Sequence, residues 1–329
     1  MMRAAWYERV GPAREVLQIG DWPAPEPGPD EVRVHLACSG VNPSDVKMRA
    51  GARGSELPFP RITPHSDGAG TIDAVGRNVK GHAPGTRVWV WNAAWRRPAG
   101  TAAEYVVLPA EQAVPLPDHV PFDAGACLGI PALTACHAVQ CHGGVAGQQV
   151  LIHGGAGAVG HYAIQIARAA GAGRIVTTVS SPEKAEIAAA AGADIVIEYP
   201  REDVAARVET LTAGTGVDRI IEVDLAANAA VDLAALRRGG LIVAYGSGAP
   251  RAEIPFFPAI LSNALLQFFI VYELERSDRE AALALLEELL AEDRLHHHIG
   301  ERLPLEQIAA AHERVEHGSA VGNVVLTLT

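Results

Sequence analysis

The chain has 329 residues, of which 49% are apolar and 20% are charged, a composition typical of a folded protein with room for two domains. This balance disfavours a disordered chain, collagen or a coiled coil. The 38 acidic residues outnumber the 27 basic ones, which gives a formal net charge of −11. Such a surplus of carboxylates disfavours a dedicated binder of nucleic acid or of an anionic membrane.

The cysteines and the first residues of the chain indicate the cytoplasm. Four cysteines in a chain of this length do not make a disulfide framework. The N-terminal residues lack the apolar core of a signal peptide. The most apolar run, residues 264–272, is about half as long as the roughly 20 residues that cross a bilayer. We therefore expect a soluble, cytoplasmic protein with reduced thiols.

Residues 1 to about 122 are expected to form an irregular, β-rich unit. Alternating apolar and polar residues predict strands at 31–37 and 86–91, and prolines and glycines break the segments between them. At the other end of the chain, two helices at 278–295 and 305–317 precede a final strand at 323–328. We expect this last strand to return to the first domain.

From about residue 123 the pattern changes to strands that alternate with helices. Helical spacing of apolar residues predicts a helix at 159–170, and Ser181 before Pro182 is typical of a helix N-terminus. The predicted strands are 149–153, 174–179, 195–197, 219–223 and 241–245. Strands separated by helices imply right-handed crossovers and a doubly wound parallel sheet.

The turn from His153 to Gly160 is the strongest local signal. Gly155, Gly157 and Gly160 match G-x-G-x-x-G between a predicted strand and a predicted helix. The N-terminus of that helix offers N–H groups and partial positive charge to a diphosphate. The turn therefore predicts a dinucleotide site, although a purely structural turn of small residues would have a similar sequence.

The end of the second strand indicates which dinucleotide binds. An NAD-selective site carries Asp or Glu about 20 residues beyond the glycine turn. No carboxylate occupies that strand end here, while Ser180 and Lys184 offer a hydroxyl and a positive charge to a 2′-phosphate, over which Tyr199 is placed to close. The alternative is that Ser180 and Ser181 cap a helix and that Lys184 is a solvated charge. The missing acid favours NADPH over NADH.

Segments in both halves of the chain are together similar to one family. They are residues 39–51, 64–70, 129–135, 153–160 and 311–319. On these motifs the chain resembles the medium-chain dehydrogenase/reductase superfamily and, within it, the zinc-independent quinone oxidoreductases of the zeta-crystallin group. The resemblance implies an α/β fold with a cofactor cleft between two domains. They would be a GroES-like catalytic domain (1–122 and 266–329) and a Rossmann NADP-binding domain (123–265).

The resemblance also bears on a metal. Zinc-dependent relatives supply a cysteine and a histidine from the two loops that here carry Asn42 and Ser66, so we expect no metal. His65 lies one position early, and we interpret it as an ordinary loop histidine while leaving a functional role open. Residues 136–142 hold two cysteines and two histidines, and we interpret the cysteines as small apolar side chains that pack beside the cofactor domain rather than as metal ligands. We interpret the three histidines at 296–298 as a solvated turn.

The family implies roles for individual residues. It places Asn42 and Asp45 on the substrate side and Thr134 near the nicotinamide, with Asn42 donating to the acceptor oxygen and the proton coming from Lys47 or water. A turn at Asn42 and a helix cap by Asp45 are the structural alternatives. The implied cofactor contacts are Gly155, Ala156, Gly157, Ala158, Val159, Gly160, Ser180, Lys184, Tyr199, Gly246, Ser247, Phe269 and Val271.

These expectations describe an NADPH-dependent, metal-free quinone reductase. A reductase of enone or alkenal double bonds is the alternative, and a dinucleotide-sensing or RNA-binding protein with little turnover is a third. The apolar run 264–272 predicts an edge strand that pairs with a second copy, so we expect a homodimer or a homotetramer.

Overall fold

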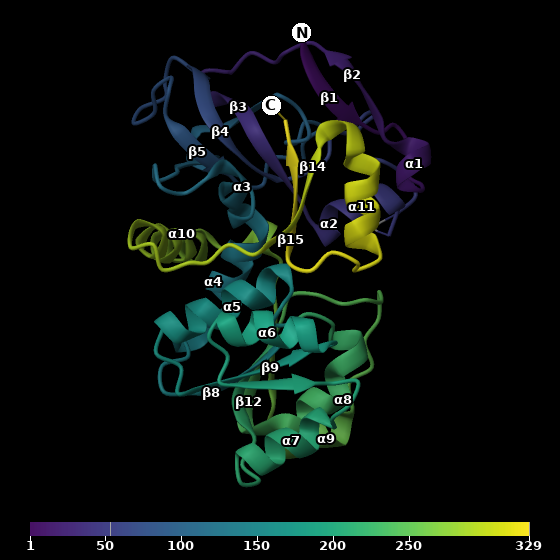
Figure 1. Cartoon of the computed structure of the whole chain (residues 1–329), viewed down its shortest axis with the longest axis vertical. Coiled ribbons are helices and arrows are strands. Elements are labelled where there is room, and N and C mark those ends of the chain that lie inside the picture. Colours follow the sequence, from purple (N-terminus) through teal and green to yellow (C-terminus); the bar gives the residue numbers. More distant parts are fainter. Residues whose placement is uncertain (53, 329) are drawn as a thin grey trace. The chain divides into compact units, whose positions relative to one another are not determined.

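The computed structural model describes residues 1–52 and 54–328, which divide into two compact units (Figure 1). The first unit comprises 1–130 and 297–329, and the second comprises 131–296. Both boundaries lie later in the chain than the expected 122 and 265. The first moves because α4 (Leu133–Gln140) starts the second unit, and the second moves because residues beyond 265 pair with the parallel sheet and are followed by a helix that contacts α4.

Within the described residues, the first unit is built on a seven-stranded mixed sheet with the order β14–β15–β3–β4–β5–β7, and β6 lies beside β3. All pairs are antiparallel except β14 with β15. The strands are β1 (Met2–Trp6), β2 (Gln18–Trp22), β3 (Glu31–Val41), β4 (Asp67–Val75), β5 (Arg87–Val90), β6 (Tyr105–Pro109), β7 (Ala113–Pro115), β14 (Ile299–Pro304) and β15 (Asn323–Thr327). β15 pairs with β3, which confirms the return of the last strand to the first unit.

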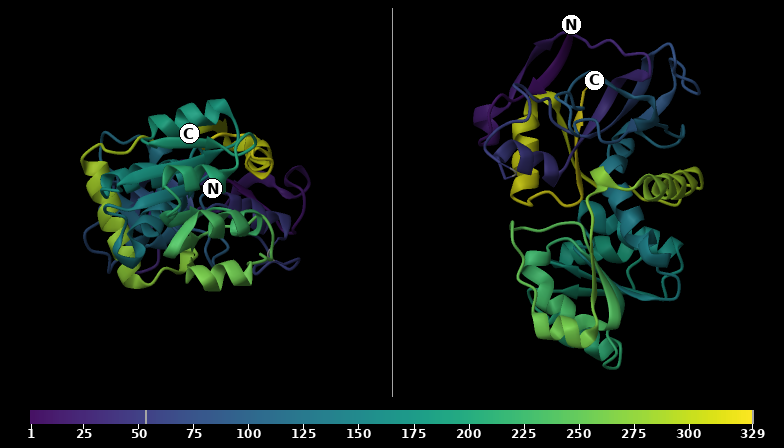
Figure 2. Two further views of the ribbon diagram at one scale, coloured as in Figure 1. Left: turned by 90° about the horizontal axis from the view of Figure 1, so that it is seen from below. Right: turned by 180° about the vertical axis from the view of Figure 1, so that it is seen from behind.

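The core of this sheet follows from the alternation of apolar residues. Val32, Val34 and Leu36 of β3 are fully buried with Ile72 of β4 and Val88 of β5. The helices are α1 (Ala13–Val16), α2 (Pro43–Ala50), α3 (Phe122–Gly125) and α11 (Ile308–Glu316). In Figure 2, α11 lies beside α2, and it also contacts α1 and β15.

The second unit holds a parallel sheet that, in the part of the chain described, has six strands in the order β10–β9–β8–β11–β12–β13. The strands are β8 (Gln149–His153), β9 (Arg174–Val179), β10 (Ile195–Glu198), β11 (Val217–Glu222), β12 (Leu236–Ala244) and β13 (Leu265–Phe268). The strand order reverses between β8 and β11, and ligands of open α/β sheets bind at the carboxyl ends of the strands at such a point.

Helices cover both faces of the parallel sheet, α5 and α6 on one and α7, α8 and α9 on the other (Figure 1). They are α5 (Ala158–Ala169), α6 (Pro182–Ala190), α7 (Val204–Leu211), α8 (Leu225–Ala235), α9 (Phe256–Ser262) and α10 (Arg276–Ala291). Ser181 is the N-cap of α6 and accepts the N–H of Lys184 at 3.4 Å, as predicted. β8 and β9 have the predicted bounds, because both are short, buried apolar runs.

A group of large apolar side chains is exposed on α9 and β13. They are 54% to 72% exposed and comprise Phe256, Phe257, Ile260, Leu261, Leu265 and Phe268. β13 pairs with β12 on one side and is the edge of the sheet among the described strands. None of the helices in residues 1–52 and 54–328 has the length and apolar character that a membrane span needs.

Candidate functional site

The glycines of the turn differ in how much space a side chain would have. A Cβ on Gly160 would clash with the carbonyl oxygen of Gly154, so the fold itself requires glycine there. Gly157 has an ordinary φ of −78°, and a Cβ on it would meet only the Gly154 oxygen, at 3.2 Å. A Cβ at 157 would therefore press on one backbone oxygen without the severe overlap found at Gly160, and a glycine here also lets a ligand approach the backbone.

The N-terminus of α5 is open for an anion. Gly157 is its N-cap residue, and no side chain caps the helix. His161 N–H donates to the Gly157 oxygen at 3.0 Å and is the first amide of the helix to find its partner four residues back. The amides of residues 158–160 precede it and have no intrahelical acceptor. These amides fit a diphosphate.

The structure brings the expected 2′-phosphate residues to one edge of the sheet. Lys184 Nζ donates to Ser180 Oγ at 2.9 Å. Tyr199 N–H donates to the carbonyl of Val179 at 3.2 Å, and its side chain is 54% exposed. Arg201, two residues further on, is a second cation that the sequence reading missed, and it pairs with Glu198 at 3.1 Å.

The residues expected at the ribose and nicotinamide lie after β12 and β13. A Cβ on Gly246 would clash with the carbonyl of Val223, and Ser247 Oγ donates to the Ala249 oxygen at 2.7 Å. Phe269 continues the pairing of β13, with its N–H donating to Ala244 at 3.3 Å. The carbonyl of Val271 accepts from the Arg279 guanidinium, so it is already engaged within the unit.

Thr134 lies in α4 of the second unit and is 3% exposed. The buried Arg219 of β11 anchors this helix. Its guanidinium donates to the carbonyls of Ala138, Val139 and Cys141 at 3.1, 3.0 and 2.9 Å, at the end of α4. The helix that carries Thr134 is therefore fixed to the parallel sheet, whereas Asn42, Asp45 and Lys47 belong to the first unit.

Asn42 and Asp45 begin α2. The Asn42 side chain accepts the N–H of Asp45, and the Asp45 carboxylate accepts the N–H of Asn42 at 2.9 Å, which is a capping box. The helix-cap alternative for Asp45 is thus what the structure shows. Asn42 Nδ2 also donates to Asp67 Oδ2 at 2.8 Å, which leaves its second amide hydrogen outside these bonds. Lys47 lies on the same helix and is exposed.

Asp67 is a candidate functional residue that the sequence reading missed. It is fully buried, and its Oδ2 accepts from Asn42 and from the N–H of Ile130 at 3.0 Å, while Oδ1 has no hydrogen-bond partner among the described residues. Burial raises the pKa of Asp67 well above its usual value, and the charge of Asp45 acts in the same direction. These surroundings favour a protonated Asp67 that orients the Asn42 amide without adding charge.

His65 is a buried residue whose ring connects two elements of the first unit. It is fully buried with a φ of 76°, its Nδ1 lies 2.9 Å from Ser39 Oγ, and its Nε2 lies 2.9 Å from Nε2 of His312 on α11. Burial lowers the pKa of His65 to about 3 and that of His312 well below its usual value. Both rings are therefore neutral at physiological pH and connect β3 to α11.

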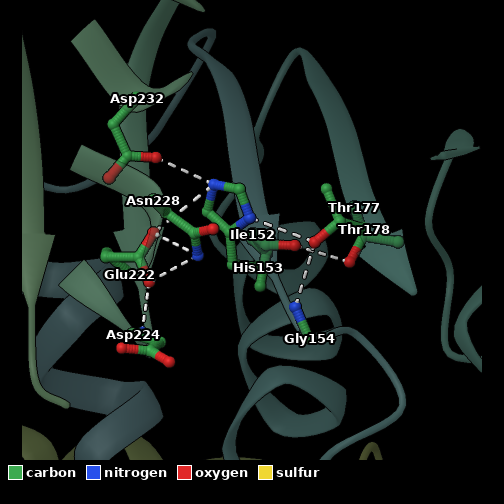
Figure 3. A network of polar contacts seen from close by, with 9 residues as sticks. All are labelled: Ile152, His153, Gly154, Thr177, Thr178, Glu222, Asp224, Asn228 and Asp232. Atoms are coloured by element: carbon green, nitrogen blue, oxygen red, sulfur yellow. Dashed lines mark hydrogen bonds and ion pairs between the residues drawn. The ribbon is translucent and has the colours of Figure 1, made fainter. Parts of the chain in front are cut away.

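A second buried histidine lies at the carboxyl end of β8. Among the described residues, one group of three His, Cys, Asp or Glu side chains has its polar atoms close together: His153, Glu222 and Asp232 (Figure 3). His153 Nε2 is 2.9 Å from Asp232 Oδ1 and 3.5 Å from Glu222 Oε2. Its Nδ1 is 3.0 Å from Thr178 Oγ1, which also accepts the N–H of Gly154 at 3.3 Å.

The two carboxylates reverse the effect of burial on this histidine. Burial alone would lower the pKa of His153, but the hydrogen bond to Asp232 and the charges of Glu222 and Asp232 outweigh it, so the net shift is upward. Burial raises the pKa of Glu222 to about 7. The charge of His153 lowers this pKa, and the charge of Asp232 raises it further. A polar residue that ends an apolar strand, as His153 and Glu222 do, is the sequence signal for this cluster.

Hydrogen bonds already occupy the oxygens of Glu222. Asn228 Nδ2 lies 3.1 and 3.2 Å from them, and the N–H of Asp224 donates to Oε1. The cluster is therefore filled by N–H donors rather than arranged as an open metal site. The cysteines considered as ligands are also poor ones, because burial raises the pKa of Cys136 to about 12 and also raises that of Cys141.

Known proteins resemble the whole chain. The zinc-binding dehydrogenase family matches residues 158–288, and the alcohol dehydrogenase GroES-like domain matches residues 28–118. A quinone oxidoreductase of Homo sapiens is 33% identical over 334 residues, which cover 100% of this chain and 98% of that protein.

Solved structures agree with this match. An NAD-dependent alcohol dehydrogenase superposes with a TM-score of 0.91 at 31% identity and covers 100% of both chains. A mycobacterial protein complexed with NADPH superposes with a TM-score of 0.87 at 30% identity, covering 99% of this chain and 100% of its own. Both cover both units of the present chain.

Proposed function

Because the chain belongs to the quinone oxidoreductase family of the medium-chain dehydrogenase/reductase superfamily, we propose that it is an NADPH-dependent reductase of quinones that works without zinc. The first unit is the GroES-like catalytic domain and the second binds the cofactor. The match to a quinone oxidoreductase over the full length favours a quinone over the double bond of an enone or alkenal. Asn42 and Ser66, in the two loops where zinc-dependent relatives carry ligands, support the zinc-free assignment.

The uncapped N-terminus of α5, directly after the glycine turn, is the observation that carries the cofactor assignment. The amides of residues 158–160 hold the diphosphate at the N-terminus of α5, and Gly155, Ala156 and Gly157 line its approach. Ser180, Lys184 and Tyr199 hold the 2′-phosphate, with Arg201 as a further cation. Gly246 and Ser247 lie by the ribose, and the remaining contacts are Thr134, Phe269 and the Val271 amide.

The first unit supplies the substrate side. When bound, NADPH supplies a hydride from its nicotinamide. The amide hydrogen of Asn42 that neither Asp67 nor the helix cap uses donates to the acceptor oxygen as negative charge develops there. Asp67 fixes the orientation of that amide, and water or the exposed Lys47 supplies the proton. Asp45 acts through the cap that holds Asn42 in place.

Substrate turnover tests the acceptor class. We expect NADPH oxidation with 1,4-benzoquinone and 9,10-phenanthrenequinone, at equal rates with and without a chelator. Turnover of a simple enone alone would transfer the activity to the double-bond alternative, and loss of rate after metal stripping would defeat the zinc-free assignment. Salt-sensitive RNA binding without any NADPH oxidation would favour the third reading, which the net charge of −11 disfavours.

Gly157→Ala tests the diphosphate site. The new methyl group lies 3.2 Å from the Gly154 oxygen, so the turn shifts slightly and the thermal unfolding midpoint falls less than in Gly160→Ala, but the methyl group occupies the approach to the α5 amides. We expect NADPH to bind about 10-fold more weakly or worse. Gly160→Ala is the contrasting variant, because its methyl group clashes with Gly154 and lowers the unfolding midpoint itself. Unchanged NADPH affinity in Gly157→Ala would place the diphosphate elsewhere.

Ser180→Asp combined with Lys184→Ala tests the 2′-phosphate site. The variant replaces a donor and a cation by a carboxylate, which repels the phosphate and accepts from a free ribose hydroxyl. We expect the ratio of NADPH to NADH efficiency to fall by about 10-fold or more. Lys80→Ala, at an exposed lysine of the first unit, is the control for loss of a positive charge. An unchanged ratio would show that another residue, such as Arg201, determines the preference for NADPH over NADH.

The exposed face of α9 and β13 supports a homodimer. β13 leaves one row of backbone N–H and C=O groups without a neighbouring described strand, and its exposed Leu265 and Phe268 are apolar. A second copy pairs with this edge about a two-fold axis, and a dimer of such dimers gives a tetramer. Sedimentation should give at least twice 34.6 kDa, and Phe268→Lys should give monomers. A 34.6 kDa particle for the unaltered chain would contradict the dimer.

The cytoplasm is the proposed compartment. This proposal is supported by the four cysteines, which are all free thiols, as is usual in a reducing compartment.

A further inference from the structure

The cluster of His153, Glu222 and Asp232 lies at the switch point of the parallel sheet. Ile152 of β8 pairs with Ile221 of β11, so the residues that follow them, His153 and Glu222, stand side by side at the carboxyl ends of the two strands. Asp232 reaches them from α8 (Figure 3). His153 directly precedes the glycine turn, so the cluster supports the place where the diphosphate is proposed to bind.

Hydrogen bonds connect the cluster to two cofactor loops. Through Thr178 Oγ1, His153 is linked to the N–H of Gly154, which opens the glycine turn. Through the N–H of Asp224, Glu222 is linked to the loop after β11, and Asp224 Oδ1 in turn accepts the N–H of Gly248 at 2.6 Å. A change of charge in the cluster therefore acts directly under both loops.

The cluster has two acids and one base, all buried. With His153 protonated and both carboxylates ionised, it carries one uncompensated negative charge. Asp232 Oδ2 is buried without a hydrogen-bond partner, so the available donors do not satisfy both acids. One more proton makes the cluster neutral, and burial favours that state.

Among the described residues, no lysine or arginine makes a hydrogen bond or ion pair with the side chains of the cluster. The interactions that shift the pKa values of His153 and Glu222 involve no lysine or arginine. β9 contributes the uncharged Thr177 and Thr178, and α8 contributes Asn228 beside Asp232. The other titratable groups near Glu222 are Asp224 and Tyr245, neither of which is a cation.

We propose that this cluster takes up a proton from solvent when NADPH binds, so that the affinity for NADPH falls as the pH rises through neutrality. The diphosphate and phosphate add negative charge beside the glycine turn, and this charge favours protonation of the Glu222 carboxylate. By linkage, protonation of Glu222 strengthens NADPH binding by the same factor. The inference rests on the proposed binding of NADPH at this turn.

The test compares NADPH dissociation constants between pH 6.0 and 8.5 for the unaltered chain and for Glu222→Gln, which mimics the protonated acid. The ionisation of NADPH itself cancels in the ratio of the two constants. We expect a ratio near one at pH 6.0 that rises to about 3- to 10-fold weaker binding by the unaltered chain at pH 8.5. Glu209→Gln, at an exposed carboxylate of α7, should follow the unaltered chain at every pH.

Calorimetry in two buffers of different ionisation enthalpy counts the protons directly. The unaltered chain should take up more protons near pH 7.5 than Glu222→Gln, and Asp232→Asn should also take up fewer, which keeps the test decisive if one variant does not fold. A pH-independent ratio with equal proton counts overturns the inference while the proposed function stands. A stoichiometric metal in the purified protein also overturns it. Absence of NADPH binding at any pH defeats the proposed function first.

Discussion

Two buried histidines, one in each unit, have opposite protonation behaviour at nearly the same burial. His65 is 0% exposed and His153 is 4% exposed. His65 contacts Ser39 and a second histidine, so burial lowers its pKa to about 3, whereas His153 contacts two carboxylates and its pKa rises despite burial. Between these two histidines the charge of the partners, not the depth of burial, sets the direction of the pKa shift.

The acids follow the same division between the units. Within residues 1–52 and 54–328 no cation is bonded to the Asp67 carboxyl group, so its surroundings favour the neutral form, as they do for His65 and His312. Glu222 shares its pocket with His153, and the pKa of this acid, raised to about 7, lies within reach of physiological change. In the first unit His65, His312 and Asp67 favour their neutral forms, whereas the second unit keeps a charged pair with one acid in excess.

His153→Leu should give the largest effect. The change leaves two buried carboxylates facing each other without a cation, which costs about 3–5 kcal/mol of the free energy of unfolding of the second unit near pH 8. At pH 5.5 the loss is smaller because Glu222, whose pKa is raised to about 7, is protonated. Urea titration monitored by hydrogen exchange of residues 149–179 measures it. Equal losses at both pH values would show that packing rather than charge dominates at His153.

Acidification should unfold the first unit before the second. His65 and His312 stay neutral in the folded state but take up protons when unfolded, so their contribution is present above about pH 6.5 and is lost as the pH falls. We expect a loss of about 2–4 kcal/mol between pH 6.5 and 4.5. His153 has the opposite sign, because its contribution is present at low pH and is lost as the pH rises.

All five tryptophans (Trp6, Trp22, Trp89, Trp91 and Trp95) lie in the first unit, so their fluorescence reports this unit alone. The pH at which tryptophan fluorescence shows half of the first unit unfolded should be higher than the pH at which amide exchange in β8 and β9 shows the second unit half unfolded. Coincident midpoints would mean that the two units unfold together.

Glu222→Gln should flatten the pH dependence of the second unit. The raised pKa of Glu222 means that the folded state favours its protonated form, so stability falls as the pH rises from the ordinary value of 4.5 through about 7. Between pH 5 and 8 the unaltered unit should lose on the order of 2 kcal/mol more than the variant. Parallel curves, measured by exchange of β11 amides in urea, would remove Glu222 from the titrating group.

Asp67→Asn should have the smallest effect. An amide oxygen replaces the carboxyl oxygen that accepts from Asn42 and Ile130, so the free energy of unfolding near pH 6 changes by less than about 1 kcal/mol. Asp67→Ala, which leaves both donors unpaired, should cost about 1–3 kcal/mol. A large loss in Asp67→Asn, measured by tryptophan fluorescence in urea, would show that Asp67 is ionised and break the contrast between the units.

Local features of the sequence predicted the elements, whereas the partners of single polar residues needed the fold. The strands 149–153 and 174–179 and the cap at Ser181 were predicted because apolar runs and Ser-Pro act over a few residues. The compact units divide at residues 296 and 297 rather than near 265, because the tertiary pairing of β13 with β12 joins the residues after 265 to the second unit.

The buried clusters show the limit more sharply. His153 and Asp232 are 79 residues apart in the chain, and Asn42 and Asp67 are 25 apart. Separation along the chain does not indicate which of the many acidic residues His153 or Asn42 contacts in the fold. The sequence could mark His153 as an unusual residue in an apolar strand, but the sign of its pKa shift depends on neighbours that only the folded sheet brings together.

The exposed apolar surface of β13 and α9 should make the activity of the protein sensitive to dilution. If the proposed dimer separates in a nanomolar assay, each chain presents Phe256, Phe257 and Phe268 to water beside an unpaired strand edge. Such a surface adheres to vessel walls and to other chains, so activity would decline with time rather than with substrate use. A carrier protein in the assay buffer would then preserve the rate without changing the chemistry.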